Sequence, residues 1–377
     1  MKPKNYQICT RCVMDTSDPG ITFNDKGECN LCTEFIIKRS KYNYHGAQSD
    51  VEFKNLISQI KKSGKGKKYD CVVGLSGGID SSYVAYTCKQ NGLRVLAAHM
   101  DNGWNSDEAV SNIENIARKL DIDYESYVLN WEEFKDLQLA FLKASVPEAE
   151  TPTDIALLAA IHKVADKHGV KYVISGGNFA TEGILPKHWH YNAKDLKYLK
   201  HIQKKFGTKK IKQFPFFGFM EEMYYKLVKG MKVIYMLNYV PYCKDEAVEL
   251  LKNKLAWRYY GGKHYESVYT GFIQSYYLYK KFGIDYRRAT LATQICTGVI
   301  SREQALKELE SLPYNEQKAQ TEKEYVAKKL GINIQEFEKI INLPAKWYSD
   351  YPNDEKRLGF IYDTYRKIFK KEKLANF

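Results

Sequence analysis

The stretch Tyr69-Asp-Cys-Val-Val-Gly-Leu75, followed at once by Ser76-Gly-Gly-Ile-Asp-Ser-Ser82, decides the fold of this chain. Its first half is an apolar run that predicts a buried strand. Its second half starts as a glycine turn and continues as a helix that begins near Asp80. Two adjacent glycines let backbone N–H groups approach an anion without interference from a Cβ atom. The helix start adds unpaired N–H groups and the positive end of the helix dipole. The stretch therefore predicts an anion-binding loop between a strand and a helix.

The side chains of the 76–82 loop add further anion ligands. The serines offer hydroxyl donors, and Asp80 can hold a Mg²⁺ ion that bridges phosphates. The set suits pyrophosphate better than a single phosphate. A Walker loop is excluded because no Gly-Lys-Ser/Thr follows, and a dinucleotide fingerprint is excluded because it needs a third glycine. The alternative is a serine-rich turn that merely starts a helix. The candidate nucleotide ligands in this loop are Ser76, Gly77, Gly78, Asp80, Ser81 and Ser82.

Length and charge bound the possible classes of protein. The chain has 377 residues, 44% of them hydrophobic, which leaves room for two or three domains with a full core. Its net charge of +13 favours nucleic acids or polyphosphate and nucleotide-linked substrates as partners. No apolar run approaches the roughly 20 residues of a membrane span. The start, Met1-Lys-Pro-Lys-Asn5, lacks the apolar stretch of a secretory signal. We therefore expect a cytoplasmic protein with no membrane span and with reduced cysteines.

Two CxxC pairs lie near the N-terminus, Cys9-Thr-Arg-Cys12 and Cys29-Asn-Leu-Cys32. Each pair turns two thiolates toward one ion, and two pairs complete a tetrahedral shell of four sulfurs. We predict a structural zinc ribbon over residues 1–45, because four thiolates leave no open coordination position. Disulfides are the alternative, and a cytoplasmic location disfavours them. A redox pair is disfavoured because neither CxxC opens a helix within a βαβ unit. Four scattered cysteines are expected in the core: Cys71, Cys88, Cys243 and Cys296.

Strands and helices alternate after the lysine- and glycine-rich joint at residues 61–68. Strands are predicted at residues 70–75, 94–100, 125–129 and 171–175, and helices at residues 81–91, 107–120 and 153–168. The apolar run of the second strand is typical of a parallel sheet that is covered on both faces. The pattern predicts an α/β fold with a doubly wound parallel sheet. We place this α/β domain at residues 46–230 and a helical domain for substrate or partner at residues 231–377.

Polar residues collect where the predicted strands end, which is where ligands bind in such sheets. Asp101 and Asn102 follow the second strand and are candidates for contact with a ribose or an adenine edge; an ordinary turn is the alternative. Glu182 is a candidate second carboxylate on the magnesium ion, opposite Asp80. The candidates in the loop after the fourth strand are Gly176, Asn178 and Glu182.

The back third carries one chemically interesting segment, Gly261-Gly-Lys-His-Tyr-Glu-Ser267. Lys263 on a flexible loop could neutralise a leaving pyrophosphate, and His264 or Glu266 could move a proton. A structural aromatic loop is the alternative. Arg287 and Arg288 are candidates for an anion clamp or, equally, a pair on a helix surface.

Two further patterns have competing interpretations. Residues 325–341 have helix–turn–helix spacing with Gly331 at the bend, but Glu336 and Glu338 on the second helix would meet DNA phosphates badly. We therefore expect no nucleic-acid partner from this pair. Eight lysines within residues 194–212 form either a solvated helix and loop or a surface that faces a partner or substrate.

These motifs together resemble a known family. The 76–82 loop is similar to the PP-loop, SGGxDS, of the ATP pyrophosphatases. The four-cysteine ribbon with Val13-Met-Asp-Thr-Ser-Asp-Pro19, the 178–183 turn and the 261–267 segment resemble the N-acetyl sugar amidotransferases of that superfamily. The likeness covers nearly the whole chain. It implies a PP-loop domain of the adenine nucleotide alpha hydrolase type with a zinc ribbon before it.

The resemblance implies a reaction and its requirements. An acetamido group on a sugar would become an acetamidino group, with ATP split to AMP and pyrophosphate, as in bacterial surface glycans of the pseudaminic or legionaminic acid type. ATP and Mg²⁺ would bind at the loop, Zn²⁺ would be structural, and Lys263 would assist at the reacting centre. Ammonia would come from a separate glutaminase subunit of the histidine-biosynthesis type, with a barrel-shaped companion as a further candidate.

Two rival readings stay open. A PP-loop enzyme that modifies tRNA, by thiolation or lysidine-type ligation, would suit the basic charge and the ribbon. A zinc-ribbon binding module with a degenerate loop would need no intact Ser76, Asp80 and Ser81, which argues against it.

Overall fold

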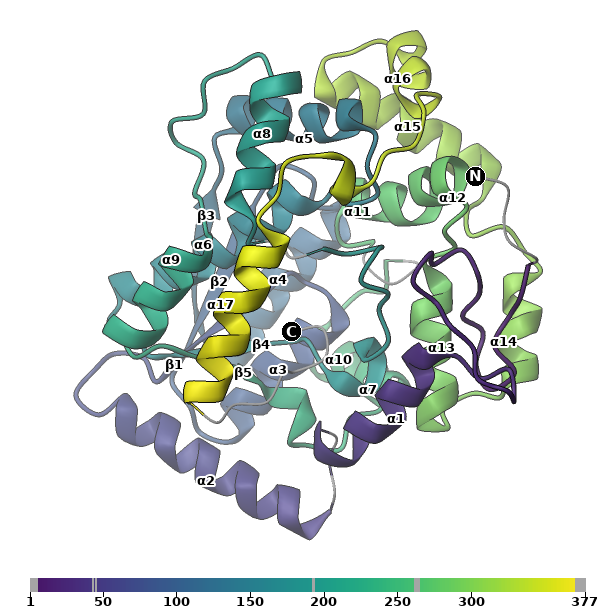
Figure 1. Ribbon diagram of the computed structural model, residues 1–377. Helices are drawn as coiled ribbons and strands as arrows, with labels where there is room; N and C mark the ends of the chain where they lie inside the picture. The colour runs from purple at the N-terminus through teal and green to yellow at the C-terminus, as the bar shows by residue number, and fades with distance from the viewer. Residues whose placement is uncertain (1–5, 43, 45, 192–193, 261–264, 370–377) are drawn as a thin grey trace.

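The computed structural model describes residues 6–42, 44, 46–191, 194–260 and 265–369 (Figure 1). Its centre is a sheet of five strands in the order β3-β2-β1-β4-β5, with every neighbouring pair parallel. The strands are β1 (Cys71–Gly74), β2 (Val95–Asp101), β3 (Asp123–Val128), β4 (Tyr172–Ser175) and β5 (Lys232–Tyr235). The predicted α/β fold with a doubly wound parallel sheet is thus confirmed.

Helices cover both faces of the sheet because successive side chains of a buried strand point to opposite sides. In β1, Cys71 and Val73 pack into one apolar cluster and Val72 into another. The first cluster contains residues of α2 (Ala47–Ser63), α3 (Ile79–Gln90), α4 (Asp107–Leu120) and α10 (Lys244–Leu255). The second contains Val164 and Ala165 of α6 (Thr151–Lys167). The result is a three-layer sandwich.

The strand order reverses beside β1, which places a ligand-binding crevice at the carboxyl end of that strand. The chain runs from β1 through the 76–82 loop into α3, and β4 lies on the other side of β1. The predicted strand, loop and helix are therefore present, in that order, at the switch point of the sheet.

A second, larger core joins the ribbon to helices outside the central sheet. The helices that contribute to it include α5 (Trp131–Ala144), α7 (Phe179–Glu182), α8 (Leu196–Phe206), α11 (Val268–Phe272), α12 (Leu278–Phe282), α13 (Arg287–Thr297), α14 (Arg302–Leu309), α15 (Glu316–Leu330) and α16 (Ile334–Ile341). The remaining helices of this part are α9 (Phe219–Met223) and α17 (Glu355–Ile368). Short π-helical turns at Tyr224–Val228 and Ile273–Tyr277 and 3₁₀ turns at Met236–Asn238 and Tyr348–Asp350 complete the helical part.

The ribbon has little regular structure of its own. Isolated antiparallel bridges, Ile8 with Asp15 and Phe23 with Cys29, precede α1 (Asn30–Tyr42). In Figure 1 the ribbon and α1 lie against α13 and α14. The ring of Phe35 on α1 stacks on Phe179 of α7, with 4.7 Å between the ring centroids. The ribbon is therefore packed against the same helices that approach the end of β4.

Some elements differ from the sequence prediction. The helix α5 was not predicted, and α6 begins two residues earlier than expected. The strand β5 lies in a region where the sequence predicts aromatic-rich helices. It is a short strand at the edge of the sheet with half of its residues exposed, so it lacks the apolar run that identifies the central strands. Within the described residues, none of the helices combines the length and the apolar character that crossing a membrane would need.

Candidate functional site

The 76–82 loop forms one wall of a pocket at the carboxyl edge of the sheet. The pocket and its mouth together measure about 540 Å³. The loop residues that line it are Ser76, Gly78, Ile79, Asp80 and Ser81. Ser82 is fully buried, and its hydroxyl donates to the carbonyl oxygen of Gly78 at 2.5 Å. Ser82 therefore shapes the start of α3 and is not among the lining residues.

Close packing against the rest of the protein fixes the shape of the loop. Gly77 has a φ of +80°, and a Cβ atom there would lie 2.4 Å from the carbonyl oxygen of Ala109. The Gly77 carbonyl accepts hydrogen bonds from Trp257 Nε1 at 2.9 Å and from Asn112 Nδ2 at 3.3 Å. Only glycine fits this position, and the loop is held rigid before any ligand arrives.

Three N–H groups of the loop donate to hydroxyl oxygens. Ser76 donates to Ser81 Oγ at 3.2 Å, Gly78 to Ser76 Oγ at 3.2 Å and Ile79 to Tyr260 Oη at 3.3 Å. A phosphate oxygen accepts more strongly than a hydroxyl because it is charged. The loop can therefore exchange these bonds for bonds to a pyrophosphate group without rearranging its backbone.

Asp80 brings a carboxylate to the pocket at the first turn of α3. The hydroxyl of Tyr242 donates to Asp80 Oδ1. Burial, and then the charge of Asp80, raises the pKa of Tyr242 far above its ordinary value, so this hydroxyl stays protonated. A carboxylate oxygen facing a pyrophosphate site is the donor type that Mg²⁺ prefers, and Asp80 fits that role.

The opposite side of the pocket is assembled from distant parts of the chain. Lys244 at the start of α10 is the one cation among the described residues that line it. Gly78 is so close to Glu266 and Tyr260 that an added Cβ would lie 3.2 Å from Glu266 Oε1 and from Tyr260 Oη. The lining residues outside the loop are Thr181, Lys244, Tyr260, Glu266, Thr290 and Gln294.

Of these six, the sequence predicted only Glu266. Lys244 lies within the stretch Pro241-Tyr-Cys-Lys-Asp245, where the proline indicates a boundary between elements but nothing indicates a pocket. Thr290 and Gln294 lie one turn apart on α13 and belong to no motif. Two predicted residues, Lys263 and His264, lie outside the described residues.

The polar residues after β2 and β4 shape turns. Asp101 Oδ1 accepts from the N–H of Gly103 at 2.9 Å, and Asn102 Oδ1 accepts from the N–H of Trp104 at 3.1 Å. Asn178 is fully buried, and its Oδ1 caps α7 by accepting from the N–H of Thr181 at 2.9 Å. None of the three is among the residues that line the pocket.

Gly176 and Glu182 both lie close to the 76–82 loop. A Cβ atom on Gly176 would lie 2.9 Å from the backbone nitrogen of Ser81, so this glycine lets the end of β4 approach α3. Glu182 does not line the pocket, but its charge adds to burial and to Asp80 in raising the pKa of Tyr242. Glu182 therefore lies near the carboxylate that it was predicted to face.

The two arginines proposed as an anion clamp are bound by protein groups. Arg287 pairs with Asp285 at 2.7 Å. Arg288 pairs with Asp15 at 3.0 Å and donates to the carbonyl of Val13 at 2.6 Å. Neither lines the pocket, and Arg288 fastens α13 to the ribbon.

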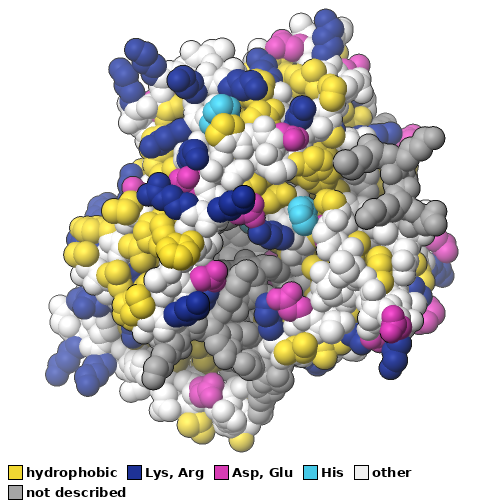
Figure 2. Space-filling model, in the orientation of Figure 1, with side chains coloured by type: hydrophobic (Ala, Val, Ile, Leu, Met, Phe, Trp, Pro, Cys, Tyr) yellow, Lys and Arg dark blue, Asp and Glu magenta, His cyan; other side chains and the backbone are white. Residues whose placement is uncertain are grey.

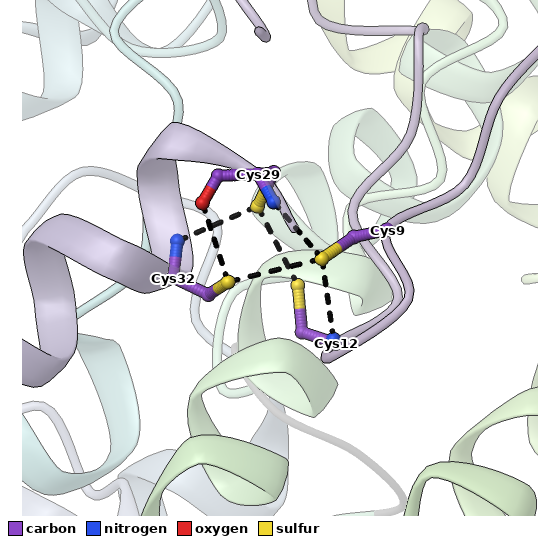
Figure 3. A group of neighbouring side chains, drawn as sticks. All are labelled: Cys9, Cys12, Cys29 and Cys32. Atoms are coloured by element: carbon purple, nitrogen blue, oxygen red, sulfur yellow. Dashed lines mark hydrogen bonds between the residues drawn. The ribbon is translucent and has the colours of Figure 1, made fainter. Parts of the chain in front are cut away.

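The four ribbon cysteines form a closed cluster (Figure 3). All four are buried, and their sulfurs lie within 4.8 Å of one another. Sulfur–sulfur separations are 3.8 Å for Cys9 and Cys32 and 3.7 Å for Cys12 and Cys29. Four sulfurs about 2.3 Å from a central zinc ion would be separated by about 3.8 Å. The cluster therefore has the dimensions of a tetrahedral zinc site.

Positive groups surround this cluster, as a thiolate shell requires. The guanidinium of Arg11 donates to Cys32 Sγ at 3.8 Å. Arg302 of α14 donates to the carbonyls of Cys9 at 2.9 Å and Cys12 at 3.0 Å. The ribbon thus holds α14 as well as α13.

The four remaining cysteines were all expected in the core, and for two of them this prediction is wrong. Cys71 and Cys88 are buried as predicted, but Cys243 is exposed and Cys296 is partly exposed. Cys243 precedes α10 where the chain turns after Pro241, and a turn of this kind leaves the side chain at the surface.

The lysine run of residues 194–212 lies on α8 and the following loop. Figure 2 shows Lys and Arg side chains gathered over the part of this face where Figure 1 places α8. Part of the run is neutralised, because Lys209 pairs with Glu132 at 2.5 Å and Lys197 with Asp354 at 3.3 Å. Four of the lysines line a shallow groove: Lys200, Lys204, Lys209 and Lys210.

Two family models match this chain. One, described as NAD synthase, matches residues 51–152, which contain the 76–82 loop. The other, described as the C-terminal domain of LPS biosynthesis protein WbpG-like proteins, matches residues 266–368. The chain is a WbpG-type member of the PP-loop family. PP-loop ATP pyrophosphatases use ATP and Mg²⁺. In this WbpG-type chain the pocket has a loop and Lys244 that suit the phosphates of ATP, and the Asp80 carboxylate suits Mg²⁺.

Relatives among curated sequences divide into two groups. An uncharacterized protein of Methanocaldococcus jannaschii, MJ1599, is 25% identical over 307 residues, 80% of this chain and 92% of its own length. A tRNA-specific 2-thiouridylase MnmA of Pediococcus pentosaceus is 30% identical over 122 residues, 30% of this chain and 31% of its own. An MnmA of Flavobacterium johnsoniae is 31% identical over 121 residues, 28% of this chain and 30% of its own.

Solved structures show more distant likeness to this WbpG-type chain. An NH3-dependent NAD synthetase of Campylobacter jejuni is 18% identical and covers 53% of this chain and 82% of its own, with a TM-score of 0.28. An NMN synthetase of Francisella tularensis is 16% identical and covers 59% of this chain and 100% of its own, with a TM-score of 0.29.

Proposed function

We propose that this protein is an ATP-dependent amidotransferase that converts the acetamido group of a sugar to an acetamidino group during synthesis of a bacterial surface glycan. One observation carries the proposal. A single chain joins a pocket with the PP-loop, Asp80 and Lys244 to a domain that matches LPS biosynthesis proteins of the WbpG-like kind.

The chemistry explains why ATP is required. An amide carbon is a poor electrophile, and its oxygen is a poor leaving group. The amide oxygen attacks the α-phosphorus of ATP, the α–β bridging bond breaks, and pyrophosphate leaves. The product is an O-adenylyl imidate. Ammonia then adds to the imidate carbon, the carbon–oxygen bond breaks to release AMP, and loss of a proton leaves the amidine.

The residues of the pocket fit the first of these steps. The N–H groups and serine hydroxyls of the 76–82 loop would hold the departing pyrophosphate. Mg²⁺ bound at Asp80, with Glu182 as a second carboxylate, would spread the developing negative charge. Lys244 lines the same pocket and would neutralise the leaving group, the role that the sequence assigned to Lys263. Glu266 is placed to move a proton.

A separate protein would supply the ammonia. Among the described cysteines, four face one another in the ribbon and two are buried in the core, so none of these six suits a glutaminase nucleophile. We propose a glutaminase subunit of the histidine-biosynthesis type, with a barrel-shaped companion as a further candidate, that delivers ammonia through a protein channel. Full turnover of glutamine by the purified chain alone would contradict this partner.

One experiment tests the reaction. The chain is mixed with ATP, Mg²⁺, ammonium chloride and a panel of nucleotide-linked acetamido sugars, and products are identified by mass spectrometry. We expect AMP, pyrophosphate and a sugar in which one amide oxygen has been replaced by NH. The Asp80→Ala variant is the control for activity that does not use this pocket. Failure of wild-type protein to modify any sugar on the panel, with ATP bound, would refute the proposal.

The second candidate function is modification of tRNA. The thiouridylase relatives match 30% and 28% of the chain at 30 and 31% identity. Cys243 is exposed and precedes Lys244 of the pocket. Binding of tRNA with a steep dependence on salt concentration would favour this function. The WbpG-like domain is the reason why we favour the sugar reaction.

A further inference from the structure

An apolar stripe faces solvent on the helix that α9 and the following π-helical turn form together, from Phe219 to Val228. Its four side chains have the spacing of one helical face, and between 45% and 72% of each is exposed. Hydrophobic side chains with this spacing are usually packed against a core, so their exposure indicates a surface that meets a partner. The apolar stripe consists of Met220, Tyr224, Leu227 and Val228.

The neighbouring helix α17 adds to this apolar surface. Tyr362 of α17 packs its ring against Phe219, with 5.5 Å between the centroids, and its hydroxyl donates to Glu222 Oε2 at 2.5 Å. The two helices therefore lie side by side. Along α17, Phe360 is 73% exposed and Ile368 is 68% exposed.

A row of positive charge lies on α8, which adjoins both of these helices. The lysine stripe, Lys197, Lys200 and Lys204, has the spacing of one helical face and is exposed, whereas the opposite face of α8 is buried. Lys197 pairs with Asp354 at the start of α17 at 3.3 Å. Lys194, two residues before α8, pairs with Glu222 of α9 at 2.8 Å. The lysine stripe thus belongs to the same surface as the apolar stripe.

The loop after α8 extends the positive surface and is held from below. Asp136 of α5 is buried and accepts hydrogen bonds from the N–H groups of Thr208 and Lys209, both at 3.0 Å. These bonds fix the loop in the shape that forms the lysine groove, which together with its mouth measures about 830 Å³. The groove is lined by Lys200 and Lys204 of α8 and by Lys209 and Lys210 of the loop.

Much of this charge is free to meet an anion. Lys200, Lys204 and Lys210 form no ion pair within the part of the chain that the structure describes. Figure 2 shows the two kinds of side chain on one face of the molecule. Hydrophobic side chains gather where Figure 1 places α9, and Lys and Arg side chains gather where it places α8.

The combination selects the partner. In a pair of identical copies, the lysine stripe of one copy would meet either the lysine stripe or the apolar stripe of the other, and neither arrangement matches. A nucleic acid would match the lysines but would leave Met220, Leu227 and Phe360 without an apolar partner. A bilayer with anionic lipids matches both, because its phosphates attract lysines and its acyl boundary accepts aliphatic side chains. The net charge of +13 favours the same partner.

We propose that the face formed by the apolar stripe, α17 and the lysines of α8 docks this protein on the surface of an anionic lipid bilayer. The apolar stripe enters the boundary between headgroups and acyl chains, and the lysines bind the lipid phosphates. None of these side chains lines the PP-loop pocket, so the inference is independent of the reaction proposed above.

Sedimentation of the full chain with lipid vesicles tests this docking. One set of vesicles contains equal parts of phosphatidylglycerol and phosphatidylcholine, and the other contains phosphatidylcholine alone. We expect binding to the anionic vesicles, much weaker binding to the neutral ones, and loss of the difference as salt is raised.

Two double variants separate the two halves of the face. Leu227→Ser with Val228→Ser should lower binding to the anionic vesicles roughly tenfold or more, because two exposed aliphatic side chains no longer leave water. Lys200→Ala with Lys204→Ala should lower it by a similar factor and leave binding to neutral vesicles unchanged. All four side chains are exposed, so the melting temperature should not change.

Matched controls lie elsewhere on the surface. Val299→Ser replaces a side chain that is 65% exposed between α13 and α14, and Lys119→Ala replaces an exposed lysine on α4. Both should bind the anionic vesicles as the unmodified chain does.

Three results would overturn the inference. The first is no binding of the unmodified chain to anionic vesicles at low salt. The second is equal binding by the double variants and their controls. The third is a dimer, or a complex with the glutaminase subunit, that Leu227→Ser with Val228→Ser abolishes in a chain that does not bind vesicles, since the face would then serve a protein partner.

Discussion

The four-cysteine ribbon and the PP-loop pocket are both built on short local motifs, but their ligand atoms are arranged differently. In the ribbon, the four sulfurs face one another and are fully enclosed. In the pocket, the groups of the 76–82 loop and Asp80 face an open space that distant residues complete. A closed set of ligands stabilises a fold, whereas an open set leaves room for a substrate. The two regions should therefore respond differently to mutation.

The largest effect should follow loss of zinc. Binding of a structural zinc ion to four ligands is worth roughly 10 kcal/mol or more of folding free energy, and the ribbon holds α13 and α14 through Arg288 and Arg302. We expect Cys12→Ser to lower the melting temperature strongly and to reduce activity, because Thr290 and Gln294 of α13 line the pocket. Metal analysis should give one zinc per chain.

The control for the ribbon is Cys88→Ser, a buried thiol outside the cluster. It should lower stability modestly and leave the zinc content unchanged. A purified chain that is stable, active and free of zinc would contradict the structural role of the ribbon.

The second effect is a loss of chemistry without a loss of stability. Replacing Asp80 by alanine removes the carboxylate that faces the pyrophosphate site and should lower ATP-dependent turnover by roughly 1,000-fold. The melting temperature should change little, because Asp80 is partly exposed in the pocket. Release of pyrophosphate from ATP measures the effect, with the exposed neighbour variant Asp245→Asn as the control. Turnover that survives in Asp80→Ala would show that the pocket is not the reaction site.

The contrast between the regions also explains what could be predicted from sequence. The ribbon and the near wall of the pocket lie within short segments, where spacing alone brings the ligands together. Lys244, Thr290 and Gln294 come from the start of α10 and from α13, and only tertiary packing brings them to the loop. For Asp101 and Asn102 the sequence left two interpretations open, contact with a nucleotide or an ordinary turn. The structure shows turns, because their side chains accept hydrogen bonds from the N–H groups of Gly103 and Trp104. Such hydrogen bonds cannot be recognised from residue types alone.

The third effect tests the far wall of the pocket. Lys244→Ala should lower kcat/KM for ATP by roughly 100-fold, since one positive donor to a developing anion is lost. Lys244→Arg should restore part of the activity because the charge is kept. Lys252→Ala, on the same helix and paired with Glu249 at 3.1 Å, serves as the control. Equal rates for Lys244→Ala and Lys252→Ala would show that Lys244 does not neutralise the leaving pyrophosphate, and would favour Lys263 for that role.

The smallest effect should come from the exposed thiol beside the pocket. Cys243 precedes Lys244 at the start of α10, so an activity that depended on sulfur transfer would need it. The amidination of a sugar uses no thiol, because ammonia attacks an already activated carbon. We therefore expect Cys243→Ser to keep the pyrophosphate release and the product yield of the unmodified chain. Complete loss of activity in Cys243→Ser, with ATP binding and melting temperature unchanged, would instead favour thiolation and would make α10 a reactive element of the site.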